Sequence, residues 1–148
     1  PILEITKKHP ELRADQNFIA EAAMLHDIGI FLCHAPQIFC YGTHHYIEHG
    51  YLGADILRRE GLKRHALVCE RHTGTGFTKE TIMEKNLPLP HRDMRPVSIE
   101  EEIICYADKF FSKTRADVLN DLDRIRQSIK KHDESNVQYF ELWHAKFS

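Results

Sequence analysis

His26 and Asp27 stand together at the end of a segment whose apolar residues recur at helical spacing. Steps of three and four lead from Ile19 through Ala22 to His26, so the imidazole shares the apolar face and Asp27 lies beside it. A carboxylate buried there is costly unless a positively charged partner offsets it. The pair by itself fits a metal site, and it equally fits a core histidine and a helix-end carboxylate satisfied by neighbours.

Three more residues of the same chemical types occur on later segments with helical spacing. His49 lies on a stripe with Leu52, His72 ends a short apolar segment before a glycine turn, and Asp108 continues the stripe of Ile104. Each also fits an ordinary core or helix-end position. Together, histidines and carboxylates from four helices of one small domain predict a site for one or two divalent metal ions. The predicted ligands are His26, Asp27, His49, His72 and Asp108.

The elements that must position these ligands are predicted to be helices. Asp15 is a candidate N-cap for the helix that ends near residue 27, and Ser98 with Glu101 has the form of a capping box at the start of a long helix. Residues 31–43, which include Pro36 and Gly42, are expected to form a loop. Further helices are expected from about residue 44 to 61, in a short segment that carries residues 66–69 and breaks at 74–76, over about 78–86, and near 117–131 and 135–147.

The fold class that follows is all-α, because no strand pattern extends beyond a few residues. We expect residues 1–148 to form one compact multi-helix bundle with the metal site between its helices. Its core is expected over about residues 16–112, and the helices over 117–147 are additional.

Composition limits the classes of partner. The net charge of −2 shows no basic excess, so extended nucleic acid is not an expected partner. No apolar run is long enough to cross a bilayer, and the first residues do not resemble a signal peptide. The cysteines form no CxxC pair, so we expect reduced thiols and a cytoplasmic protein. They are Cys33, Cys40, Cys69 and Cys105.

Four segments carry a resemblance to the HD superfamily. The run over residues 22–29 resembles the family's His-Asp-Ile-Gly signature, and residues 48–54 resemble its His-x-x-x-Gly-Ala segment. Residues 71–76 and 101–109 are similar to its later histidine turn and to its last helix with a ligand aspartate. The chain looks closest to the small stand-alone HD-Ile-Gly proteins of bacteria and archaea.

The resemblance implies a metal-dependent phosphohydrolase or phosphodiesterase. Asp27 would bridge two metals and be the catalytic carboxylate. His26 and Asp108 would serve one ion, and His49 and His72 the other. A hydroxide between the ions would attack phosphorus. The ions would be iron, manganese, zinc, nickel or cobalt.

The substrate is expected to be a small phosphorylated metabolite or nucleotide. His45, Arg71 and Lys109 are candidates to bind its phosphate or protonate the leaving group. Ile30 stands where many family members have a lysine that contacts phosphate, which weakens the inference about substrate class.

The family's first ligand is a histidine on the preceding helix. His9 is too close to His26 to take that role, and the expected position falls before Pro1. We therefore expect one ligand of the metal site to be missing from this chain.

Three alternatives stay open at this stage. One is a di-iron oxygenase of HD type, because the ligand set alone does not separate it from a hydrolase. Another is a non-catalytic regulatory module with a structural metal. The last is a zinc site whose spacing matches no common zinc finger, made by Cys33, His34, Cys40 and His44.

Overall fold

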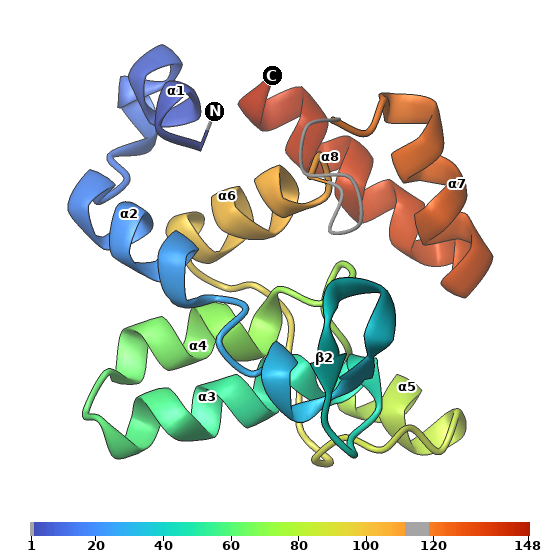
Figure 1. The fold of residues 1–148 in the computed structure, drawn as a ribbon. Coiled ribbons are helices and arrows are strands. Elements are labelled where there is room, and N and C mark those ends of the chain that lie inside the picture. Colours follow the sequence, from blue (N-terminus) through green and yellow to red (C-terminus); the bar gives the residue numbers. More distant parts are fainter. Residues whose placement is uncertain (1, 112–118) are drawn as a thin grey trace.

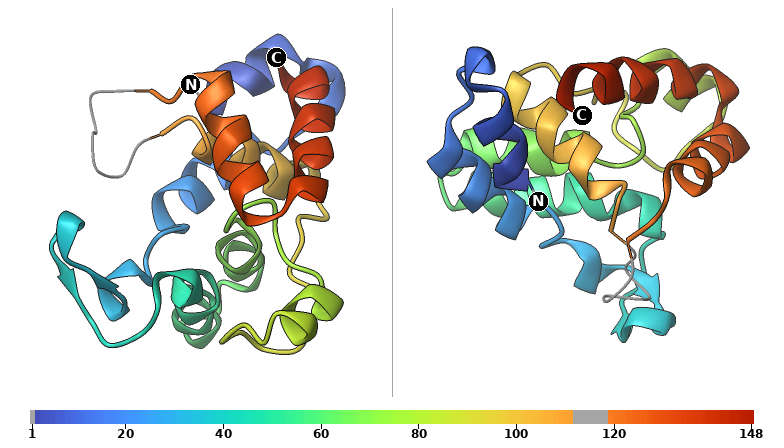
Figure 2. Two further views of the ribbon diagram at one scale, coloured as in Figure 1. Left: turned by 90° about the vertical axis from the view of Figure 1, so that its right-hand side faces the viewer. Right: turned by 90° about the horizontal axis from the view of Figure 1, so that it is seen from above.

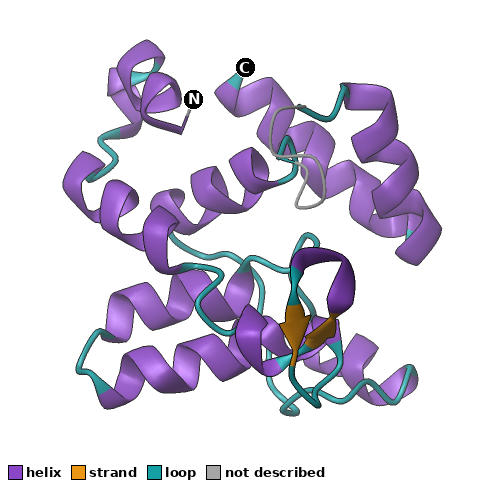
Figure 3. Cartoon of the chain, viewed as in Figure 1, coloured by secondary structure: helices purple, strands orange, loops and turns teal. Residues whose placement is uncertain are grey.

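The structure, a computed structural model, describes residues 2–111 and 119–148. Helices dominate these residues, which confirms the predicted all-α fold (Figures 1 and 3). The α-helices are α1 (Ile2–Lys8), α2 (Gln16–Leu25), α3 (His49–Arg59), α4 (Lys63–Arg71), α5 (Lys79–Glu84), α6 (Ile99–Asp108), α7 (Leu122–His132) and α8 (Val137–Phe147). Single 3-10 turns are η1 (Pro10–Leu12), η2 (Ile30–Leu32), η3 (Pro36–Ile38), η4 (Tyr46–Glu48) and η5 (Glu134–Asn136).

The predicted caps determine where two of these helices begin. The Asp15 side chain accepts a hydrogen bond from the Phe18 amide at 3.0 Å, and α2 begins at the next residue, Gln16. Ser98 and Glu101 form the reciprocal capping box that opens α6. Each of these two helices carries part of the candidate site.

The predicted loop over residues 31–43 contains a short antiparallel hairpin. Strand β1 (His34–Ala35) pairs with β2 (Cys40–Tyr41) in the register His34 to Tyr41 and Ala35 to Cys40. Phe39 turns the chain between them with a left-handed φ of 60°. The hairpin stands away from the helices in Figure 2. Strands of two residues are too short to produce an alternating pattern in the sequence.

Of the two helices predicted after residue 113, the second agrees with the structure and the first begins later than predicted. α8 agrees with the expected range of 135–147, after the single turn η5. α7 begins only at Leu122, where the Asp121 side chain accepts from the Arg124 amide. Residues 117 and 118 of the expected helix lie outside the described residues. Residues 119–121 are not helical, because the cap at Asp121 sets the start.

The main hydrophobic core joins the C-terminal helices to the rest. Phe18 and Ile19 of α2 belong to one buried cluster with Ile104 of α6 and with Phe140 and Trp143 of α8. In Figure 1, α3 and α4 lie as an antiparallel pair below α2 and α6, while α8 lies beside α6 and α7 packs against α8. None of the helices described has the length and apolar character that a membrane span requires.

A buried carboxylate on α4 gives a first testable expectation. Burial opposes ionisation of Glu70, but hydrogen bonds from Arg92 and Arg58 outweigh it and lower the pKa of Glu70. A lowered pKa in the folded state means that ionised Glu70 stabilises the fold above its unfolded pKa of about 4.3. This contribution declines below that pH and is lost as the pH falls through the folded pKa.

Glu70→Gln should therefore reduce the free energy of unfolding at pH 7 by about 2 kcal/mol, because two guanidinium groups lose their charged acceptor. Urea unfolding should show the difference from wild type shrinking below pH 4. Asp55→Asn is the control, since this exposed partner of Arg58 should contribute under about 0.5 kcal/mol. A difference that grew on acidification would contradict the assignment.

Candidate metal centre

The five predicted ligands come from four helix ends that meet in the middle of the molecule. His26 is the C-cap of α2, and Asp27 lies in the turn after it. His49 begins α3, His72 is the C-cap of α4, and Asp108 is the last residue of α6. Two groups of these side chains have ligand atoms within 4.8 Å of one another, namely His26 with His72 and Asp108, and Asp27 with His49 and His72.

Asp27 lies between the two groups with one oxygen toward each. Its Oδ2 is 3.3 Å from Nε2 of His26, whose Nε2 is also 3.1 Å from Oδ1 of Asp108. Its Oδ1 is 3.2 Å from Nε2 of His72 and 3.4 Å from Nε2 of His49. A carboxylate in this position is able to contact two ions at once.

Backbone carbonyls determine the tautomers of the histidines. Nδ1 of His49 lies 2.6 Å from the Tyr46 carbonyl, and Nδ1 of His72 lies 2.6 Å from the Cys69 carbonyl. A carbonyl only accepts, so each Nδ1 carries the proton and each neutral ring presents a lone pair at Nε2. These two Nε2 atoms are only 2.9 Å apart. Two lone pairs that face each other repel, and a cation between them removes the repulsion.

The pKa shifts of two of the histidines also indicate that the cluster favours a cation. Burial lowers the pKa of His72 to about 4, so its ring is neutral near neutral pH. Burial also opposes protonation of His26, but Asp108 and Asp27 outweigh it and raise the pKa of His26. A positive charge is thus favoured between the two carboxylates. The donor set of neutral imidazoles and carboxylates fits a borderline divalent ion such as zinc, manganese or iron.

Glycines let the helix ends approach closely enough to form this cluster. A Cβ on Gly29 would lie 2.3 Å from the His49 carbonyl oxygen and 2.5 Å from the Gly53 amide nitrogen. A Cβ on Gly53 would lie 2.6 Å from Sγ of Cys69 on α4. Gly53 thus lets α4 come close to α3. The turn after Asp27 therefore packs backbone against backbone on α3.

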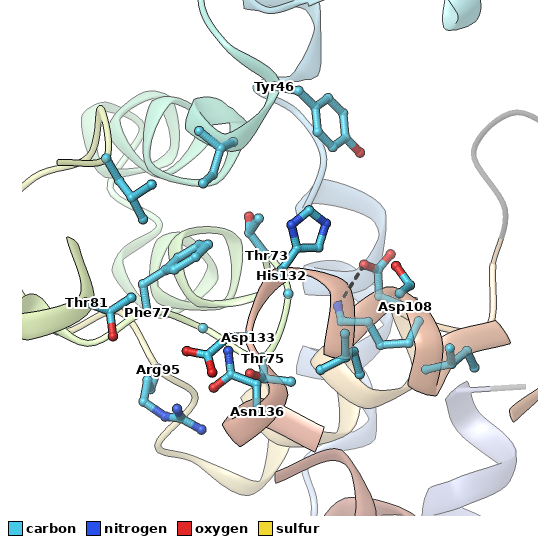
Figure 4. A pocket seen from close by; sticks show the side chains of 18 of the residues that line it. Tyr46, Thr73, Thr75, Phe77, Thr81, Arg95, Asp108, His132, Asp133 and Asn136 are labelled. Atoms are coloured by element: carbon cyan, nitrogen blue, oxygen red, sulfur yellow. Dashed lines mark hydrogen bonds and ion pairs between the residues drawn. The ribbon is translucent and has the colours of Figure 1, made fainter. Parts of the chain in front are cut away.

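A pocket of about 690 Å³ lies beside the cluster, and Asp108 and Lys109 form part of its wall. Its other walls come from the hairpin, the 73–77 loop after α4 and helix α7 with η5. Figure 4 shows Asp108 at one end of the pocket and Asn136 toward the other. The cluster of candidate ligands thus borders a space that is large enough for a small organic ligand.

The predicted phosphate contacts occupy different positions. Nζ of Lys109 is 3.4 Å from Oδ2 of Asp108 and donates to the His72 carbonyl at 3.0 Å. The guanidinium of Arg71 is instead held by Glu101 at 2.6 Å. His45 is exposed, and its ring accepts from a backbone amide in the cap of η4. Of the three, Lys109 is the one that lines the pocket.

The pocket also has walls that the sequence reasoning missed. Helix α7 and η5 contribute His132, Asp133 and Asn136, and the 73–77 loop contributes Thr75 and Phe77. The glycine turn was the signal for the loop. No spacing in the sequence relates α7 to that loop.

Two other expectations concern residues outside the cluster. The cysteine–histidine zinc site is not among the groups of metal-ligand geometry found in residues 2–111 and 119–148. His34 instead belongs to β1, and Cys33 is buried behind it. The exclusion of His9 as a ligand agrees with its position, because its ring contacts Glu11 and the carbonyl of Ser148.

The amino-acid sequence of the chain is similar to that of a known protein family and of several individual proteins. Residues 2–112 match the family described as HD domain. The chain is 35% identical over 135 residues to the uncharacterized protein MJ0778 of Methanocaldococcus jannaschii, covering 90% of this chain and 72% of that one. No solved structure matches the chain significantly.

Two further relatives are much longer than the part that matches. A tRNA (cytidine(56)-2'-O)-methyltransferase of Picrophilus torridus is 32% identical over 83% of this chain and 31% of its own length. The protein of the same name from Thermoplasma volcanium is 38% identical over 67% of this chain and 26% of its own. The chain therefore spans less than a third of these two relatives.

Proposed function

The chain belongs to the HD domain family, and from this premise we propose that it is a metal-dependent phosphohydrolase acting on a small phosphate ester. The observation that carries the proposal is the meeting of imidazole lone pairs and two carboxylates at the wall of a pocket lined by cationic side chains. Divalent ions in such a site supply Lewis acidity and lower the pKa of water.

In this proposal each of the five candidate ligands has its own role in holding the metal ions. Asp27 holds both halves of the centre together, because each of its oxygens faces a different group of ligands. His26 and Asp108 serve one half, and His49 the other. His72 is within reach of both groups.

Lys109 is the side chain we assign to the phosphate. Its ammonium is beside Asp108 and lines the pocket, so a phosphate oxygen there gains a charge-assisted hydrogen bond. Arg71 is committed to Glu101, and its Nε is buried without a hydrogen-bond partner. We therefore assign it to positioning α6 against α4 rather than to the substrate. His45 receives no role in the proposal.

Methyl transfer is not part of the proposal. The methyltransferase name belongs to proteins of which this chain spans less than a third. A cluster of histidines and carboxylates suits metal-assisted hydrolysis, in which the protein fixes the ions and the substrate phosphate.

Phosphate release is the test. With zinc, or with manganese kept divalent, the protein should release inorganic phosphate from at least one small phosphomonoester in the absence of oxygen. If it acts on a phosphodiester, it should form a phosphomonoester, from which an added phosphatase releases inorganic phosphate. Hydrolysis needs only a Lewis acid and water, so a redox-inert ion suffices. The measurement is a colorimetric phosphate assay across nucleotides and sugar phosphates, repeated with a chelator as control.

The two alternative functions give opposite results in the same assays. Activity confined to the iron-loaded protein, with consumption of oxygen, would replace the hydrolase by a di-iron oxygenase. Absence of turnover with every metal, while metal still raises the melting temperature, would leave a regulatory metal-binding module.

A further inference from the structure

Two threonine hydroxyls in the pocket wall are buried without a partner. Oγ1 of Thr73 and Oγ1 of Thr75 have no hydrogen-bond partner, and Thr75 is only 2% exposed. Both residues line the pocket, on the loop that follows His72. A buried hydroxyl without a partner costs free energy that a bound ligand atom recovers. A ligand atom that reaches either hydroxyl would therefore gain a hydrogen bond that the protein alone does not supply.

The charges around the pocket favour an anion. Four cationic side chains line it, against the carboxylates of Asp108 and Asp133, and a metal ion would add to the positive charge. The cations are Lys85, Arg95, Lys109 and Arg124. Nζ of Lys85 donates to the His132 carbonyl and lies 3.8 Å from Oδ2 of Asp133, and the guanidinium of Arg95 lies over the ring of Tyr139.

The floor between the polar groups is apolar and partly aromatic. Ile47, Leu87 and Ile129 line it together with the ring of Phe77. Figure 4 shows Phe77 on the same side of the pocket as Asn136, away from Asp108. A planar heterocycle stacks on such a ring, and a side-chain amide pairs with its edge. A sugar phosphate would instead leave its hydroxyls against isoleucine and leucine.

We propose that this pocket binds a 5′-mononucleotide, with the phosphate at Asp108 and Lys109 and the heterocycle between Phe77 and Asn136. Asn136 belongs to η5, beyond the region 2–112 that matches the family. The C-terminal segment is then the part of the chain that selects the ligand. The assignment of the phosphate end rests on the proposed function, whereas the heterocycle end is testable by binding alone.

Binding without turnover is the decisive experiment. Isothermal titration of the chelator-treated protein uses 5′-AMP, 5′-GMP, 5′-CMP and 5′-UMP, with ribose 5-phosphate as the probe that lacks a base. At least one mononucleotide should bind about tenfold more tightly than ribose 5-phosphate, as expected for one stacked base. Asn136→Ala and Phe77→Leu should each reduce that preference several-fold, the second because it keeps apolar bulk but loses the ring.

Gln138→Ala is the matched control. Gln138 is exposed on α8 and does not line the pocket, so the preference should stay at the wild-type value. Melting temperatures of all variants verify that they fold. Equal affinity for mononucleotides and ribose 5-phosphate would overturn the proposal, and so would an Asn136→Ala protein that behaves like Gln138→Ala.

The binding and turnover results separate the two proposals. A base-dependent affinity without phosphate release from any substrate would refute the hydrolase and leave the mononucleotide site intact. Phosphate release that is equally fast from ribose 5-phosphate and every mononucleotide, without a base-dependent affinity, would refute the mononucleotide site and leave the hydrolase.

Discussion

Asp27→Ala is expected to abolish phosphate release with every metal and to remove most of the stabilisation that metal gives the fold. The side chain is the one whose two oxygens face both halves of the cluster, at 3.2–3.4 Å from three Nε2 atoms. Without it, neither half keeps its shared carboxylate. A carboxylate that contacts both ions has no substitute among the neighbouring ligands, because Asp108 belongs to the group with His26 and His72 and not to the group that contains His49.

The measurement has a thermodynamic readout as well as a kinetic one. A ligand that binds only the folded state at 100 times its Kd adds about 2.7 kcal/mol of stability. For a chain of this size that gain raises the melting temperature of the wild-type protein by roughly 5–10 °C. Asp27→Ala should show a much smaller rise when zinc or manganese is added.

Asp55→Ala is the control for this substitution. Asp55 is an exposed carboxylate on α3 outside the cluster, and it should keep both the turnover and the metal response. Turnover by Asp27→Ala near the wild-type rate would contradict the bridging role of Asp27. It would also contradict the division of the centre into two halves that share this carboxylate.

Local sequence rules account for much of the site. The helical steps that placed His26 and His49 on apolar faces correspond to the end of α2, where His26 is half-buried, and to the start of α3, where His49 is buried. The caps at Asp15 and Ser98 fixed the starts of α2 and α6. A cap is a contact within one turn of helix, so the sequence nearby contains all the information that it needs.

Contacts between distant segments account for what was not predicted. Arg71 has the charge of a phosphate ligand, but Glu101, thirty residues away, holds its guanidinium. The pocket wall from α7 depends on how that helix packs on α8, and no local pattern in the sequence encodes that packing. His132 and Asn136 are polar residues at helix ends, which are common on any surface. Such placements follow from tertiary packing rather than periodicity.

Gly29→Ala is expected to lower the free energy of unfolding by about 3 kcal/mol and to impair metal binding. The backbone of Gly29 has φ −83° and ψ −5°, which alanine adopts without strain, so the effect is steric. The new methyl group would meet the His49 carbonyl oxygen and the Gly53 amide, and both are backbone atoms of α3. Relief requires the turn to move away from α3, and Asp27 moves with it.

Gly61→Ala separates this steric effect from a general loss of stability. Gly61 has a φ of +80° and nothing within 4 Å of an added Cβ, so alanine there costs only backbone strain, about 1 kcal/mol. Thermal unfolding with and without zinc should show a reduced melting temperature for both variants. The metal-dependent rise should persist in Gly61→Ala and be largely lost in Gly29→Ala. If Gly29→Ala kept the full rise, the close approach of the turn to α3 would not be what positions Asp27 beside His49.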